Sequence, residues 1–208
     1  IDLVASNDPN QEISVTFSQM VPHLRRAIET TDSRYDKNVS FELSTHRNFL
    51  LEVLTQLETS LDPDMDIVLL TRDSVGEISE QHLLKAGAWY DPRNNTIYMR
   101  SPDFVNNNFT PGVLVHELLH ALSFNVIDKW EKVKTAPVGE QDLKHWQAVQ
   151  NLIAVRDQVK ASSVYQDMSP RSKARVDYAL TNIDELMSDG LSHGPVIDLL
   201  SHVQVTVP

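Results

Sequence analysis

Two histidines and a glutamate lie close together in the stretch VLVHELLHAL, at positions 113–122. His116 and His120 are four residues apart, so on a helix both imidazoles project from one face and can bind the same metal ion. Glu117 follows His116, about 100° around the helix, where its carboxylate can reach a water on that ion. Neutral imidazoles leave a zinc ion electrophilic, and a nearby carboxylate can accept the proton of the attacking water. The spacing therefore predicts zinc-dependent hydrolysis with Glu117 as general base.

The residues around this polar triplet are almost all apolar, which predicts a helix buried within the protein; they are Val113, Leu114, Val115, Leu118, Leu119, Ala121 and Leu122. Imidazoles and carboxylates removed from water need hydrogen bonds or a metal. The alternative to a metal site is a pair of core histidines bonded to backbone carbonyls, with Glu117 in a salt bridge. Because the chain has no cysteine, its side-chain metal ligands must be nitrogen and oxygen atoms.

A third ligand is expected further along the chain, where residues 182–190 read NIDELMSDG. Glu185 and Asp189 are four residues apart on a predicted helix there, and their apolar neighbours favour burial. The competing candidates are Asp128, Glu140, Asp142 and His145. Asp128 is the strongest of these because it follows His120 by two turns on the same predicted helix.

With both motifs in place, the chain resembles the gluzincin branch of the zincin metallopeptidases, the thermolysin-like pattern. The resemblance is carried by His116, Glu117, His120, Glu185, Ser188 and Asp189. It implies that His116, His120 and Glu185 bind one zinc ion per chain. It also implies that Asp189 bonds the outer nitrogen of His116, which would fix the tautomer and orientation of that ring. A metzincin-like continuation is excluded because Ser123 and Val126 stand where glycine and histidine would be required.

A second resemblance covers residues 169–205, which contain a YAL-x-N element, the acidic D-E-L, H-G-P and a closing L-L-x-x-V. This order is similar to metallopeptidase-like domains in the large polyvalent proteins of bacteriophages and conjugative elements. It implies a domain cut from a large virion or injected protein. Secreted bacterial effector proteases that contain the same HELLH string are the alternative source.

Peptide hydrolysis at such a site also needs a donor for the oxyanion of the tetrahedral intermediate. Tyr178 and His193 are the candidates for this catalytic role, with ring packing and turn capping as their structural alternatives. The zincin resemblance further implies that an extended substrate pairs with an edge strand ahead of the active helix. Residues 96–101 are the expected strand, with substrate-binding residues Thr96, Ile97, Tyr98 and Met99.

The pattern of apolar residues predicts the elements that must position these groups. Helices are expected over 14–31, starting properly near Pro22, over 45–57, 113–130 and 140–161, from Ser169-Pro170 to 191, and after 193–195. Strands are expected over 39–43, 66–71, 88–90 and 96–100, the last two as a hairpin. The result is an α+β, zincin-like fold: a small mixed sheet with an edge strand over the active-site helix, then a helical C-terminal half.

The whole chain, 1–208, is expected to form a single zincin-like domain. Within it, residues 1–12 would be an extended leader, 13–110 an α/β part, and 111–208 a helical part that carries the zinc site. A start at Ile1 rather than Met suggests a processed product or an excised domain.

Composition limits the partners. The 208 residues are 41% hydrophobic and carry a net charge of −11, which disfavours nucleic acid and anionic membranes as partners. No run of about 18 apolar residues and no signal peptide is found. Cytoplasmic, virion-associated and host-delivered locations all stay open, and a protein or peptide substrate is the expected partner.

The leading interpretation is a zinc-dependent metalloendopeptidase. The alternative from another class is a zincin-fold binding or structural module of a phage or mobile-element protein. Glu117 argues against that alternative, because a structural zinc site needs no base and is normally closed by a fourth protein ligand. A metal hydrolase that acts on a non-peptide bond is the third possibility.

Overall fold

The computed structural model describes residues 13–30, 43–70, 88–100 and 111–206. The expected leader at 1–12, the expected strand at 39–43 apart from its last residue, and Ser101 lie outside these ranges. The described residues form two compact units, one up to Leu122 and one from Ser123 onward. The predicted α+β class, with a small mixed sheet, is confirmed. Within the described ranges, no helix is both long and apolar enough to cross a lipid bilayer.

The first unit contains a four-stranded sheet built from β1 (Ile13–Thr16), β2 (Asp66–Leu70), β3 (Ala88–Asp91) and β4 (Thr96–Arg100). The strand order is β1-β2-β4-β3. β4 pairs in parallel with β2 and in antiparallel with β3, so the predicted hairpin is confirmed. Ile67, Ile97 and Met99, which the register places on one face of the sheet, are buried.

The start of the first helix was predicted wrongly. Residues 13–16 form β1, and α1 (Phe17–Thr30) begins five residues before Pro22 and contains it. Thr16 and Gln19 form a reciprocal capping box: Gln19 N–H donates to Thr16 Oγ1 at 3.3 Å, and Thr16 N–H donates to Gln19 Oε1 at 3.0 Å. This cap fixes the helix start, whereas the proline lies in the second turn.

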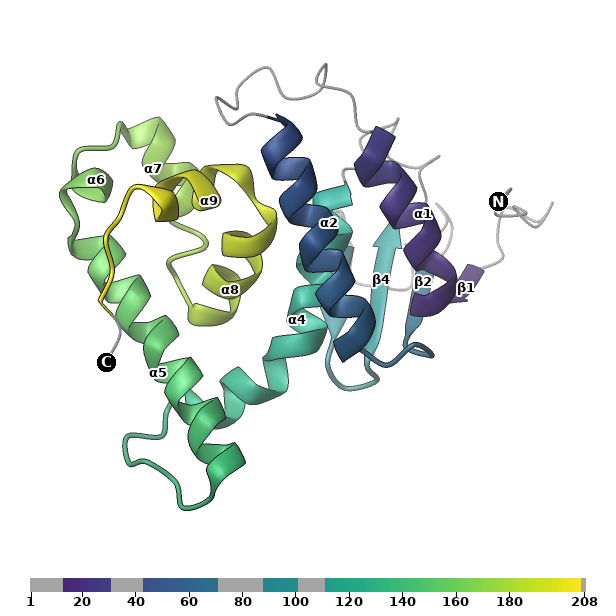
Figure 1. The fold of residues 1–208 in the computed structure, drawn as a ribbon, viewed down its shortest axis with the longest axis horizontal. Helices are drawn as coiled ribbons and strands as arrows, with labels where there is room; N and C mark the ends of the chain where they lie inside the picture. Colours follow the sequence, from purple (N-terminus) through teal and green to yellow (C-terminus); the bar gives the residue numbers. More distant parts are fainter. Residues whose placement is uncertain (1–12, 31–42, 71–87, 101–110, 207–208) are drawn as a thin grey trace. The chain divides into compact units, whose positions relative to one another are not determined.

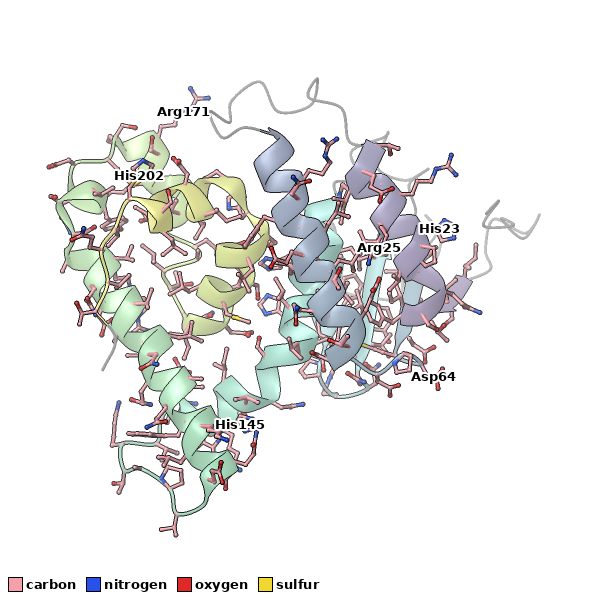
Figure 2. The ribbon with its side chains drawn as sticks, viewed as in Figure 1. His23, Arg25, Asp64, His145, Arg171 and His202 are labelled. Atoms are coloured by element: carbon pink, nitrogen blue, oxygen red, sulfur yellow. The ribbon has the colours of Figure 1, made fainter. Side chains whose placement is uncertain are left out.

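α1 and α2 (Leu43–Ser60) lie side by side in front of the strands (Figure 1). Leu50, Leu54 and Leu57 of α2 are buried, as expected for one face of an amphipathic helix. Arg25, labelled in Figure 2, donates from α1 to Glu58 of α2 at 2.7 Å. Because this ion pair is partly exposed, it adds little to the stability of the contact between α1 and α2.

α4 (Pro111–Trp130) is the helix that contains the HELLH motif. Its residues up to Leu122 belong to the first unit and those from Ser123 onward to the second. Leu114, Val115, Leu118 and Leu119 are at most 2% exposed, so burial of this helix is confirmed, although Leu122 at its unit boundary is 37% exposed.

The second unit is helical, as predicted for this part of the chain. It contains α5 (Glu140–Ala161), α6 (Ser163–Gln166), α7 (Pro170–Val176), α8 (Ile183–Ser192) and α9 (Gly194–Ser201). α5 has the bounds expected from the sequence. α8 packs against both α5 and α9. One buried cluster of this unit joins the end of α4, α5 and α8 through Ile127, Trp130, Val149 and Ile183.

The single helix predicted from Pro170 to residue 191 is wrong, because the chain turns between α7 and α8. Asn182 adopts an extended conformation (φ −139°, ψ 167°) and its side chain accepts the N–H of Glu185 at 2.7 Å. This is an N-cap, and an asparagine in that position competes with helix continuation. Thr181 Oγ1 donates to the carbonyl of Tyr178 at 2.6 Å within the same turn.

Candidate metal centre

The two histidines of α4 face one another, as their spacing predicts. Their Nε2 atoms are 2.9 Å apart, and the rings meet edge to face with centroids 4.6 Å apart. His120 is buried, with 8% of its surface exposed, and His116 is half-buried. The pair therefore presents two imidazole nitrogens to one point next to an apolar helix face.

This separation fits two ligands of a single zinc ion. Zn–N bonds of about 2.0–2.1 Å place two ligand nitrogens about 2.9 Å apart at a right angle and about 3.3 Å apart at a tetrahedral angle. The same distance also suits a hydrogen bond from one neutral imidazole to the other, provided that only one Nε2 carries a hydrogen. Either way, both Nε2 atoms point to the position that a shared ligand would take.

Glu117 is held on the sheet side of the helix. It is 9% exposed, and its Oε2 accepts the backbone N–H of Tyr90 at 2.8 Å. Tyr90 belongs to β3, so the carboxylate is anchored to a strand of the same unit. Sequence reasoning did not identify this contact, because no local pattern relates a helix residue to a strand residue 27 positions away.

The β3–β4 hairpin that contains Tyr90 is stabilised by side-chain hydrogen bonds and by ring stacking. Tyr90 Oη donates to Asn95 Oδ1 at 3.0 Å, and Asn95 has a positive φ of 54° in the tight turn. Burial, with a smaller effect of Asp91, raises the pKa of the Tyr90 phenol. Hydrogen bonds from Arg93 lower the pKa of Asp91. Across the strands, the rings of Trp89 and Tyr98 stack with centroids 4.9 Å apart. These contacts fix the strand on which Glu117 depends.

The expected edge strand was assigned to the wrong segment. β4 lies between β2 and β3, and the register pairs Thr96, Ile97, Tyr98 and Met99 with residues of both neighbours. A substrate cannot add a strand to a backbone that is already paired on both sides. In the sheet as the structure describes it, the edge next to β4 is β3, which contains Tyr90.

In the second unit, Glu185 lies in the first turn of α8. Its Oε1 accepts the hydroxyl of Tyr178 at 2.9 Å, although Tyr178 itself is 62% exposed. Tyr178 lies in the segment 177–182 between α7 and α8, and this segment brings its hydroxyl to Glu185. Next to Glu185, Asp184 Oδ1 accepts the hydroxyl of Ser123 from α4 at 3.0 Å.

Asp189 and His193 follow Glu185 toward the end of α8. Asp189 is half-buried, and its carbonyl accepts the N–H of His193 at 2.8 Å. His193 is exposed and is the residue between α8 and α9. The predicted support of His116 by the Asp189 carboxylate stays a prediction, as do the catalytic roles of Tyr178 and His193.

The competing ligands have other contacts or are exposed. Asp142 pairs with Lys129 at 3.0 Å and Glu140 with Lys144 at 2.7 Å. Figure 2 labels His145 on α5, where its Nε2 lies 2.8 Å from the side-chain amide of Gln141. Asp128 is exposed on α4. Among the residues that the structure describes, the group that could hold a metal ion consists of His116, His120 and Glu185.

Comparison with known proteins adds no relative: no family model, no curated protein and no solved structure matches this chain. The assignment of the site therefore depends on its own residues.

Proposed function

We propose that the chain is a zinc-dependent metalloendopeptidase, in which His116, His120 and Glu185 bind the metal. The observation that carries the proposal is the pair of imidazoles, His120 buried and His116 half-buried, whose Nε2 atoms lie 2.9 Å apart, next to a carboxylate that accepts the N–H of Tyr90. A site of two histidines and one carboxylate is typical of catalytic zinc centres, which leave a coordination position for water or substrate.

The ion would supply Lewis-acid polarisation of water and of the substrate carbonyl. The residues of the chain supply the rest. Glu117 acts as general base, and the bond from Tyr90 N–H to its Oε2 orients the carboxylate. A carboxylate fixed by a backbone donor keeps its orientation through the reaction, which a mobile side chain would not.

For the oxyanion, Tyr178 is better supported than His193. Its hydroxyl reaches the carboxylate of the proposed third ligand at 2.9 Å, whereas His193 is an exposed residue between two helices. When the hydroxyl turns from Glu185 to the substrate, its one hydrogen can be donated to negative charge that develops on a substrate oxygen. Substrate backbone pairing is proposed at β3, the edge strand next to β4, through backbone groups other than Tyr90 N–H, which already bonds to Glu117.

The test is the metal content of the purified, tag-free protein by elemental analysis, with Glu185→Gln and Asp128→Asn measured beside it. We expect one zinc per chain, lost in Glu185→Gln and retained in Asp128→Asn, because both changes remove a charge while keeping side-chain size. Absence of metal after incubation with excess zinc would overturn the proposed function. If zinc is lost in Asp128→Asn but retained in Glu185→Gln, the third ligand is Asp128 and not Glu185.

A further inference from the structure

Glu185 must be held at a fixed distance from the histidines if the three are to bind one ion. The histidines are on α4 and the glutamate on α8, far apart in the sequence. Metal ligands are generally oriented by neighbouring groups that do not touch the metal, and removal of such a group weakens metal binding by about 10–100-fold. The residues next to Glu185 are therefore of interest as positioning residues.

One direct link joins α4 to the first turn of α8. Ser123 Oγ donates to Asp184 Oδ1 at 3.0 Å, and Ser123 is 8% exposed. Ser123 follows His120 by three residues on the same helix, and Asp184 precedes Glu185 by one. The bond therefore connects a residue one turn after the proposed ligand His120 to the residue directly before the proposed ligand Glu185.

A second contact maintains the same alignment. Ile183, fully buried, packs in one cluster with Ile127 and Trp130 of α4 and with Val149 of α5. Apolar packing holds the two helices together without directional preference. A hydrogen bond to a carboxylate is directional, so the part-buried Ser123–Asp184 bond limits how α8 can slide along α4 and rotate against it.

We infer that the Ser123–Asp184 hydrogen bond is the device that sets Glu185 in register with His116 and His120 for metal binding. The inference rests on the proposed function. Asp184 bonds to Ser123 of α4, and Glu185 is the next residue of α8, about 100° further around the helix axis. Two further hydrogen bonds hold Glu185. Its Oε1 accepts the hydroxyl of Tyr178, and its N–H donates to the side chain of Asn182.

The experiment measures the dissociation constant for zinc by competition with a chromogenic chelator, on the full chain, together with the thermal midpoint of the apo protein. Ser123→Ala and Asp184→Ala should each weaken zinc binding by about tenfold. The double variant should bind zinc no more weakly than the worse single one, because each single change already removes the same hydrogen bond. Ser123→Thr, which keeps the hydroxyl, should bind zinc with the affinity of the unchanged protein.

Ser162→Ala is the matched control. Ser162 is a half-buried serine of the second unit, and its hydroxyl donates to the carbonyl of Val159 and caps α6. Its removal should lower the thermal midpoint of the apo protein while leaving the zinc dissociation constant unchanged. A general loss of stability would instead move all three alanine variants together.

The outcomes separate the two proposals. If the unchanged protein binds one zinc but Ser123→Ala and Asp184→Ala bind it equally well, the positioning role is overturned and the metal site stands. If Ser162→Ala weakens binding as much as they do, the positioning role is also overturned. If the unchanged protein binds no zinc, the proposed function fails and this inference fails with it.

Discussion

At the residue scale, Glu117 is the side chain whose replacement separates metal binding from catalysis. Glu117→Gln keeps an oxygen that can accept Tyr90 N–H at the present 2.8 Å, so the helix and strand should stay in place. An amide cannot accept the proton of the attacking water. We therefore expect zinc content to be unchanged and the rate of peptide hydrolysis to fall by about 10²–10⁴-fold, measured with a fluorogenic peptide mixture and elemental analysis.

The control for this change is Glu140→Gln, which removes a negative charge from an exposed glutamate paired with Lys144. Its hydrolysis rate should stay that of the unchanged protein. A Glu117→Gln variant that remains active would remove Glu117 from the role of base, while one that also loses its zinc would show that the carboxylate holds the ion.

Residue types and local spacing could predict the histidine pair but not the contacts that brace it. Two histidines four apart on a helix must share a face, and the 2.9 Å separation confirms this. The bond from Tyr90 to Glu117 and the bond from Ser123 to Asp184 join residues 27 and 61 positions apart. Such pairs depend on how helices meet strands or other helices, which no single-segment pattern contains.

At the scale of elements, the start of α8 decides where Glu185 lies. Asn182 caps this helix by accepting Glu185 N–H at 2.7 Å. Asn182→Ala should therefore destabilise the protein by about 1 kcal/mol and also weaken zinc binding, because the first turn that holds Glu185 loses its cap. Urea unfolding and a chelator competition measure the two effects.

Ser169→Ala provides the comparison, since Ser169 caps α7 by accepting Ser172 N–H in the same unit. It should cost a similar free energy of unfolding without changing zinc affinity. Asn182→Asp, which keeps a capping oxygen, should retain both properties. Equal zinc affinity in Asn182→Ala and the unchanged protein would mean that the cap stabilises α8 without affecting the metal site.

Elements with strong periodicity were predictable, and their junctions were not. α5 and the β3–β4 hairpin follow the sequence pattern closely. The break between α7 and α8 was missed because Ser169-Pro170 signals a start, whereas the internal cap at Asn182 looks like any polar helix residue until its φ and ψ are known. The edge strand was misplaced because strand order is a property of the sheet, and β4 is enclosed by pairing with β2 and β3.

At the scale of the whole molecule, the proposed ligands are contributed by two helices that are distant in the sequence, so only a folded chain brings all three to one ion. An unfolded chain still has the local histidine pair but lacks the complete site. Zinc should therefore bind the native state more tightly than the unfolded state, and its binding should raise stability by mass action. The net charge of −11 also favours accumulation of divalent cations around the protein.

Thermal unfolding of the apo and zinc-loaded protein measures this linkage. At free zinc about 100-fold above the dissociation constant, the native state gains about 2.7 kcal/mol, which for a domain of this size raises the midpoint by about 5–10 °C. Excess chelator should reverse the shift. Glu185→Gln should reduce it strongly, since only the histidine pair then remains, and Asp128→Asn should leave it intact. An equal shift in Glu185→Gln would show that zinc binds without the carboxylate of α8, and the three-ligand site would have to be abandoned.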